Sequence, residues 1–225
     1  MLVKKYRSRI INIISPFEGI YTLEFESLNG PYKFYPGQFL HLALDQDYDG
    51  SGQWPESRCF SMQSDPNDTT VKITYSVKGK YTRQMEEALK AGSEVWLKLP
   101  YGELFTQSHN KLNTVFIAGG TGITPFLSLF THESFQKYIN PRIYLGFKSV
   151  SYNIYHKELK NVKDINPVIF YEDINGVMDI SLIFSQNGKN CDYFLSGPPT
   201  MIKTFKNKLL AEGVADCRII TDDWE

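Results

Sequence analysis

Two glycine-containing turns in the second half of the chain have the residue types that bind phosphate groups. The first, AGGTGITP over residues 118–125, follows an apolar segment and begins a segment with helical spacing. Gly120 and Gly122 would let a ligand approach the backbone, and the free amides of a helix start attract an anion such as a pyrophosphate. Pro125 suits a first helical turn. The spacing is G-x-G-x-x-P, which differs from the Rossmann fingerprint, and a turn without a ligand has the same pattern.

The second turn is SGPPTMI, residues 196–202, which also ends an apolar segment. Gly197 permits close approach, and Pro198 and Pro199 favour a helix start. Ligands of open α/β sheets bind beyond the carboxyl ends of the strands. We therefore expect the two turns to share one crevice.

Two motifs in the first half of the chain also fit an anion or an aromatic ring. Arg58 begins the segment RCFS, where its guanidinium can hold a phosphate bidentately and Ser61 can face a ring nitrogen. Residues 79–82, GKYT, begin a predicted helix in which Thr82 can cap and the free amides favour an anion. A solvated arginine and an ordinary helix start explain the same residues.

The elements that must position these motifs change character near residue 108. In the first half, short runs with alternating apolar side chains are separated by turns rich in Gly, Pro, Asn and Asp, with one helical stretch at 81–90. This pattern is typical of a small antiparallel barrel, which we assign to residues 1–108. The predicted strands cover residues 19–27, 37–44, 58–64, 69–77 and 93–99.

In the second half, strand-like and helical segments alternate, which indicates a parallel sheet covered by helices on both faces. We assign this α/β domain to residues 109–225. Predicted strands cover 113–118, 142–147, 167–172, 191–196 and 217–221, predicted helices cover 125–138, 152–160 and 199–213, and 179–185 is of unclear type.

The composition of the chain disfavours several classes of binding partner and of metal centre. The 225 residues include 24 Lys and Arg against 25 Asp and Glu, so no positive field attracts nucleic acid or anionic lipid. Three cysteines and four histidines lack the spacing of a metal or iron–sulfur site. The longest uncharged stretch, residues 112–130, contains three glycines and a proline, which disfavours a membrane span. Together with an N-terminus unlike a signal peptide, these features predict a soluble, cytoplasmic protein without a metal.

In their order along the chain, the four motifs resemble the ferredoxin–NADP reductase family of flavoprotein oxidoreductases. The resemblance spans nearly the whole chain: R-x-[YF]-S at Arg58–Ser61, G-x-x-[ST] at Gly79–Thr82, G-T-G-x-x-P at Gly120–Pro125 and [CS]-G-P-x-x-M at Ser196–Met201. It implies a β-barrel that binds flavin, FAD or alternatively FMN, and an α/β domain that binds NAD(P)H.

The resemblance also implies roles for individual residues. Arg58 and Thr82 would contact the flavin phosphates, Phe60 and Ser61 would lie against the flavin ring, and residues 73–77 would line its ribityl or adenosine side. Hydride transfer would involve Ser61, Ser196 and Trp224. The cofactor-binding set comprises Arg58, Cys59, Phe60, Ser61, Tyr75, Ser76, Val77, Gly79, Lys80, Tyr81 and Thr82 for the flavin, and Gly120, Thr121, Gly122, Thr124, Pro125, Lys148, Ser149, Gly197, Pro198 and Met201 for the nucleotide.

Three residues depart from the family pattern or extend it. Phe60 stands where many members have Tyr, and members that reduce diffusible flavin also tend to have Phe there. Ser196 replaces a Cys that often lies beside the nicotinamide. Trp224, in the C-terminal DDWE, could stack on the flavin as C-terminal aromatic residues of the family often do.

The motifs leave open whether NADH or NADPH donates the hydride and which protein accepts the electrons. Lys148 and Ser149, just past the second α/β strand, favour NADPH over NADH, although a single Lys is commonly solvent-facing. Lys5, Arg7 and Arg9 alternate along the first strand and could receive an acidic carrier such as ferredoxin or flavodoxin, or form a solvated face.

The resulting hypothesis is a flavin-dependent oxidoreductase that takes hydride from NAD(P)H and passes electrons to ferredoxin, flavodoxin or an oxygenase component. The alternatives are an NAD(P)H:flavin reductase that releases reduced flavin, and a non-catalytic subunit that senses nucleotide or flavin.

Overall fold

The computed structural model describes residues 1–45, 47–162 and 165–222. The chain forms two compact units. One contains residues 1–103 and 127–132, and the other contains residues 104–126 and 133–225. We call them the barrel unit and the α/β unit.

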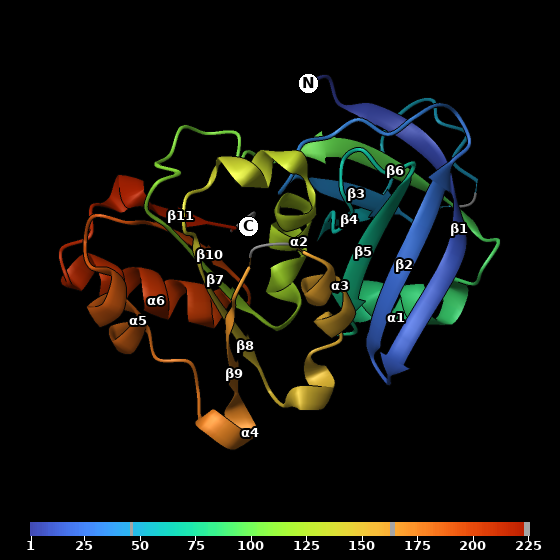
Figure 1. Ribbon diagram of the computed structural model, residues 1–225. Coiled ribbons are helices and arrows are strands. Elements are labelled where there is room, and N and C mark those ends of the chain that lie inside the picture. The colour runs from blue at the N-terminus through green and yellow to red at the C-terminus, as the bar shows by residue number, and fades with distance from the viewer. Residues whose placement is uncertain (46, 163–164, 223–225) are drawn as a thin grey trace. The chain divides into compact units, whose positions relative to one another are not determined.

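The barrel unit is an antiparallel six-stranded sheet with the order β4-β3-β6-β1-β2-β5 (Figure 1). The sheet nearly closes, because the amide of Gln63, just after β4, donates to the carbonyl of Lys72 in β5 at 2.8 Å. The elements are β1 (Lys4–Phe17), β2 (Ile20–Ser27), β3 (Phe39–Ala43), β4 (Ser57–Ser61), β5 (Thr70–Ser76), α1 (Lys80–Ala88) and β6 (Glu94–Tyr101).

Alternation along the strands explains why this sheet curls around one core. In β2, Leu23 and Phe25 are buried while Glu24 between them is more exposed, and in β5 Val71 and Ile73 are buried in the same way. The side chains of one face of each strand therefore meet in a single apolar cluster, and the other face carries the polar residues.

The α/β unit is a parallel five-stranded sheet with the order β11-β10-β7-β8-β9 (Figure 1). Its strands are β7 (Thr114–Gly119), β8 (Arg142–Phe147), β9 (Val168–Tyr171), β10 (Asp192–Ser196) and β11 (Ile219–Thr221). Its α-helices are α2 (Thr124–Thr131, whose last five residues group with the barrel unit), α3 (His156–Asn161), α4 (Glu172–Asn175), α5 (Ile180–Asn187) and α6 (Pro199–Ala211). Its 3₁₀ helices are η1 (Gly120–Ile123), η2 (Glu133–Lys137), η3 (Val150–Tyr152) and η4 (Asp216–Arg218).

Both faces of this sheet are covered, so its central strands are apolar throughout. Val115 and Ile117 of β7 belong to the cluster formed with α5 and α6, which pack against each other. Phe116, between them, points the other way and contacts the rings of Phe126 and Phe194.

The structure confirms an antiparallel barrel followed by a parallel α/β sheet. The single helix predicted for 125–138 is wrong, because α2 ends at Thr131 and the 3₁₀ helix η2 follows from Glu133. Phe135 of η2 packs near Phe116, with 6.3 Å between the centres of the two rings. The helix predicted for 152–160 begins only at His156, and the unclear segment 179–185 lies in α5, where the side chain of Asp179 caps the amide of Ser181 at 2.8 Å. None of the helices in the described part of the chain combines the length and apolar character that a membrane crossing requires.

Candidate functional site

The two glycine turns of the α/β unit are in direct backbone contact. They end the neighbouring parallel strands β7 and β10, where Ala118 pairs with Ser196. A Cβ placed on Gly122 would lie 2.5 Å from both Cα and N of Gly197. Such a distance is far inside a van der Waals contact, so glycine at this position lets the two turns meet. The structure thus brings together the two turns that were expected to share a crevice.

Gly197 and Met201 complete this contact. Gly197 has a φ of +146°, a backbone conformation that favours glycine. The Met201 methyl lies 2.8 Å from the position of a Cβ on Gly197, and its sulfur lies 2.8 Å from that of a Cβ on Gly119. Met201 therefore packs on the glycine backbone from the first turn of α6, which begins after Pro198 at the N-cap.

The first glycine turn has a tighter geometry than an α-helix start. Residues 120–123 form the 3₁₀ helix η1, with Gly120 at a φ of +55°, and Pro125 lies in the first turn of α2. The hydroxyl of Thr124 donates to the carbonyl of Thr121 at 3.0 Å, which joins the two helical pieces. The amide-rich backbone expected from the sequence is therefore present as a short 3₁₀ turn leading into α2.

Ser196 has a partner that the sequence motifs did not indicate. Its hydroxyl is buried at the end of β10 and donates to Oδ2 of Asp222 at 2.9 Å, while the amide of Asp222 donates to the carbonyl of Leu195 at 2.8 Å. The acidic pair 222–223 directly after the last predicted strand was the available signal. Trp224 lies outside the described residues.

Lys148 and Ser149, which follow β8, both contact their own loop. Nζ of Lys148 lies 5.8 Å from the centre of the Tyr152 ring, and the hydroxyls of Ser149 and Ser151 are 2.8 Å apart. Lys148 and Ser149 therefore each have a side-chain neighbour within the loop that follows β8.

In the barrel unit, Arg58 lies beside the N-terminus of α1. Its guanidinium carbon is 5.0 Å from the centre of the Tyr81 ring, within cation–π range. It donates to the carbonyl of Ser57 at 2.8 Å and to Oε1 of Glu56 at 3.0 Å. Both members of the Glu56 ion pair are more than half exposed, so the pair contributes at most about 1 kcal/mol and an arriving phosphate can replace it.

The start of α1 provides the amides for such an anion. The first intrahelical bond runs from Arg83 to the carbonyl of Gly79, which leaves the amides of Lys80, Tyr81 and Thr82 without a helical partner. The Thr82 hydroxyl accepts from the amide of Gly79 at 3.1 Å and from that of Lys78 at 2.9 Å. Thr82 therefore holds the turn with its side chain, and its backbone amide is the group left for a phosphate. No acidic residue lies in this first turn, so Arg58 and α1 fit a pyrophosphate.

The predicted ring-contacting residues lie on adjacent strands. Phe60 and Ser61 end β4 and are 8% and 7% exposed. The Phe60 ring packs edge-on to Tyr75 of β5 at 5.9 Å, and Tyr75 stacks on Tyr21 at 5.5 Å. Ser76 ends β5, and the amide of Val77 donates to the carbonyl of Gly19 at 2.8 Å. Phe60 therefore has aromatic neighbours on β5 and β2, whereas Ser61, the next residue of β4, points to the opposite face of the strand.

Cys59 alternates to the other side of β4, away from Phe60. Its sulfur lies 3.5 Å from Nε2 of His41, whose Nδ1 lies 3.3 Å from the Ser57 hydroxyl. Burial raises the pKa of the Cys59 thiol and lowers the pKa of His41, so both groups favour their neutral forms. This pair therefore lacks the thiolate of a reactive cysteine.

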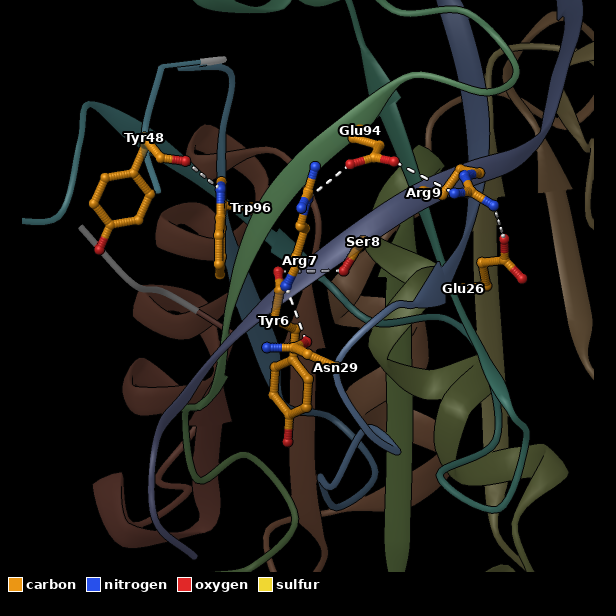
Figure 2. Close-up of polar contacts among 9 residues, drawn as sticks. All are labelled: Tyr6, Arg7, Ser8, Arg9, Glu26, Asn29, Tyr48, Glu94 and Trp96. Atoms are coloured by element: carbon orange, nitrogen blue, oxygen red, sulfur yellow. Dashed lines mark hydrogen bonds and ion pairs between the residues drawn. The ribbon is translucent and has the colours of Figure 1, made fainter. Parts of the chain in front are cut away.

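The basic residues of the first strand face acids from other strands (Figure 2). Arg7 pairs with Glu94 at 2.7 Å, and Arg9 pairs with Glu26 at 3.2 Å and with Glu94 at 3.4 Å. Lys5 bonds the Tyr48 hydroxyl and the carbonyl of Gly50. These cross-strand partners weaken the idea that an acidic carrier docks here and favour the solvated face.

No family model matches the chain. The propane 2-monooxygenase reductase component of Rhodococcus jostii (strain RHA1) is 26% identical, over 98% of this chain and 64% of the relative. The anthranilate 1,2-dioxygenase electron transfer component of Acinetobacter baylyi is 25% identical, over 84% and 57%. The dihydroorotate dehydrogenase B (NAD(+)) electron transfer subunit of Clostridium acetobutylicum is 32% identical, over 64% and 55%. The chain spans less than two thirds of the length of each of these relatives.

Solved structures share the fold over almost the full length of both chains. A ferredoxin NADP+ reductase from Neisseria gonorrhoeae, with bound FAD and NADP, has a TM-score of 0.80 and 17% identity and covers 97% of this chain and 98% of that chain. The flavohem-like FAD/NAD-binding domain of nitric oxide dioxygenase from Vibrio cholerae has a TM-score of 0.80, 18% identity and the same coverage. At these identities, the similarity shows the fold.

Proposed function

From the premise that the chain is a homologue of ferredoxin reductase-type oxidoreductases, we propose that it takes hydride from NAD(P)H and passes electrons through a bound flavin to a separate acceptor. The observation that carries the proposal is the backbone contact between Gly122 and Gly197. Two glycine turns that end neighbouring strands lie at the carboxyl edge of a parallel sheet, where open α/β sheets bind their ligands.

We assign the flavin to the barrel unit and the nicotinamide nucleotide to the α/β unit, with the boundary near residue 108. Arg58 and the first amides of α1 would hold the flavin phosphates, and Phe60, Ser61 and Tyr75 would contact its ring and chain. FAD fits better than FMN because Arg58 and three helix amides converge on one anion site suited to a pyrophosphate.

A bound flavin supplies the conversion of a two-electron hydride donor into a source of single electrons. The contribution of the chain is positioning. The glycine turns and Thr121 would hold the nucleotide phosphates, and the Ser196 hydroxyl, fixed by Asp222, would orient the nicotinamide. Ser61 would donate to the flavin ring nitrogen that accepts hydride, and Trp224 remains a candidate for covering the ring.

The names of the relatives indicate an oxygenase component as the class of acceptor, because two of them are a monooxygenase reductase component and a dioxygenase electron transfer component. Ferredoxin and flavodoxin remain possible carriers. Three free thiols suit the reducing cytoplasm, which we propose as the location.

The test is an absorbance spectrum of the purified protein followed by anaerobic titration with NADH and NADPH. We expect flavin bands that bleach with one equivalent of reduced nucleotide, and ferricyanide-dependent nucleotide oxidation. Protein that remains colourless and inert after incubation with FAD and with FMN would contradict the proposal.

Phe60 favours a second function, the reduction of diffusible flavin, because its ring offers no hydroxyl to a ribityl chain. Gel filtration separates the two functions. An electron-transfer protein keeps about one flavin per chain, whereas a flavin reductase emerges without colour and oxidises NAD(P)H only when free flavin is added.

A further inference from the structure

One polar side chain lies in the middle of α2, among buried apolar residues. Ser128 is 0% exposed, and its neighbours at 126–127 and 129–130 are Phe and Leu residues that are also buried. A serine within a helix commonly bonds a carbonyl of the preceding turn of that helix. The Ser128 hydroxyl instead donates to the carbonyl of Ser64 at 2.8 Å, across 64 residues of sequence. This bond therefore ties α2 to a distant segment of the barrel unit.

The segment that contains Ser64 directly follows β4, the strand that ends at Ser61. Residues 62–64 are buried, and the barrel holds them through several hydrogen bonds. The amide of Met62 donates to the carbonyl of Gln38 at 3.0 Å. The hydroxyl of Ser64 accepts from the amide of Lys72 at 3.1 Å. The position of Ser61 therefore depends on how the three residues after it are held.

The other end of α2 continues the first glycine turn of the α/β unit. The 3₁₀ helix η1 ends at Ile123, and α2 begins at the next residue, Thr124. The helix has eight residues, which span about 12 Å, and a hydrogen-bonded helix of this length moves as one body. One short helix thus joins the turn at residues 120–122 to the segment after Ser61.

Resting on the proposed function, we infer that Ser128 is a positioning residue that couples the nucleotide turn, residues 120–122, to the flavin strand β4. Phosphates bound at the nucleotide turn fix the start of α2, and the Ser128 hydroxyl carries the position of the helix to the carbonyl of Ser64. Occupation of the turn thereby changes the setting of Ser61, the residue that we assign to the flavin ring. Coupling between two binding sites is reciprocal, so the flavin equally affects the turn.

ADP-ribose separates this coupling from direct contact between the two cofactors. It carries the pyrophosphate and both riboses of the nucleotide but lacks the nicotinamide ring. A change in the flavin spectrum when it binds therefore reports a change in the protein around the flavin. The purified protein, supplied with flavin, is titrated with ADP-ribose while calorimetry measures binding and absorbance measures the flavin. We expect the wild type to bind ADP-ribose with a flavin difference spectrum.

Ser128→Ala removes the hydrogen bond and should uncouple the two sites. The amplitude of the difference spectrum should fall at least about threefold, while the affinity for ADP-ribose stays within about threefold of the wild type. In anaerobic rapid mixing with NAD(P)H, the limiting rate of flavin reduction should fall about tenfold. The half-saturating concentration should not change, because the lost bond affects the alignment of the reacting groups and not the binding of the nucleotide.

Two further variants show whether the hydroxyl of Ser128 is the cause. Thr131→Val is the matched control, because Thr131 is exposed at the end of the same helix and its hydroxyl donates within the helix, to the carbonyl of Leu127 at 2.8 Å. It should keep the spectrum and the rate of the wild type. Ser128→Cys keeps a weak donor of similar size and should lie between Ser128→Ala and the wild type. Thermal melts report whether each variant folds.

The wild type alone can overturn the inference, if it binds ADP-ribose without any change in the flavin spectrum. A folded Ser128→Ala variant that responds like the wild type overturns it too, as does an equal loss in Thr131→Val. In each of these cases, flavin reduction by NAD(P)H leaves the proposed function standing. A wild type that does not reduce bound or added flavin with either NADH or NADPH overturns both.

Discussion

In the barrel unit, the candidate anion site consists of a side chain and helix amides, whereas in the α/β unit it consists of backbone that a side chain would obstruct. Arg58 is half exposed and can exchange its Glu56 partner for a phosphate. Gly122 and Gly197 have no such freedom, because their backbones already touch. We therefore expect binding at the barrel site to weaken in proportion to the charge that a substitution removes. At the α/β site, a single added methyl group should be enough to disturb the structure and weaken binding.

The largest expected effect is that of Gly122→Ala. Its Cβ would meet the backbone of Gly197 and Ser196, which has to shift, so we expect the unfolding free energy to fall by about 1–3 kcal/mol. Nucleotide affinity should fall about a hundredfold through the misplaced turn. Denaturant unfolding and calorimetry measure the two effects.

The matched control is Gly146→Ala in β8. The nearest atom to an added Cβ there is the flexible end of Met178, at 3.3 Å, and the Ala118 carbonyl lies at an ordinary contact distance of 3.9 Å, so the substitution should cost much less. Equal losses in the two variants would contradict the distinction between backbone and side-chain neighbours.

Next in size is Arg58→Gln. Loss of a charge-assisted contact should weaken flavin binding by about 10- to 100-fold, with little change in nucleotide affinity. Flavin release during dialysis reports the change, and Arg83→Gln, at an exposed arginine of α1, is the control. Equal flavin retention in both variants would show that Arg58 does not hold the phosphates.

Thr82→Val should have a smaller effect, on stability. The hydroxyl that accepts from Gly79 and Lys78 is lost, which should lower the unfolding free energy of the barrel unit by about 1 kcal/mol. Thr82→Ser keeps the acceptor and should restore the wild-type midpoint in urea. A midpoint that does not change in the valine variant would show that the cap contributes nothing.

The smallest expected effect is on the pH dependence of stability, to which one histidine in each unit contributes. Burial, with a lesser contribution from Lys98, lowers the pKa of His41, and burial likewise lowers the pKa of His109. Below the ordinary value of 6.5 the unfolded chain binds more protons than the folded chain, so stability should fall as pH drops through this window. His41→Gln and His109→Gln should each reduce this slope. Identical slopes in all variants would contradict the assignment.

The strands and the glycine motifs were predictable from the sequence because their causes are local. Alternation over a few residues gives β2 and β5, and the apolar run before Gly120 gives β7. The three short helical pieces between residues 120 and 137 were not predictable, because their breaks follow from packing of Phe126 and Phe135 on Phe116 in a neighbouring strand.

The partners of the charged side chains were equally unpredictable from the sequence. No acid precedes Glu18 in the sequence, yet β-sheet pairing places Glu94 and Glu26 beside Arg7 and Arg9. Likewise Asp222 reaches Ser196 only because β11 lies next to β10. Contacts between strands far apart in sequence depend on register, which no single segment specifies.

The sequence by itself determined the two architectures and the four motifs that we propose to bind anions, since apolar periodicity, glycine and proline act within a few residues of their own position. Only the tertiary structure decided that Gly122 touches Gly197, that Arg58 stacks on Tyr81, and that Asp222 bonds Ser196. Each of these pairs joins segments separated by more than twenty residues, and their proximity follows from how the strands pair and the helices pack.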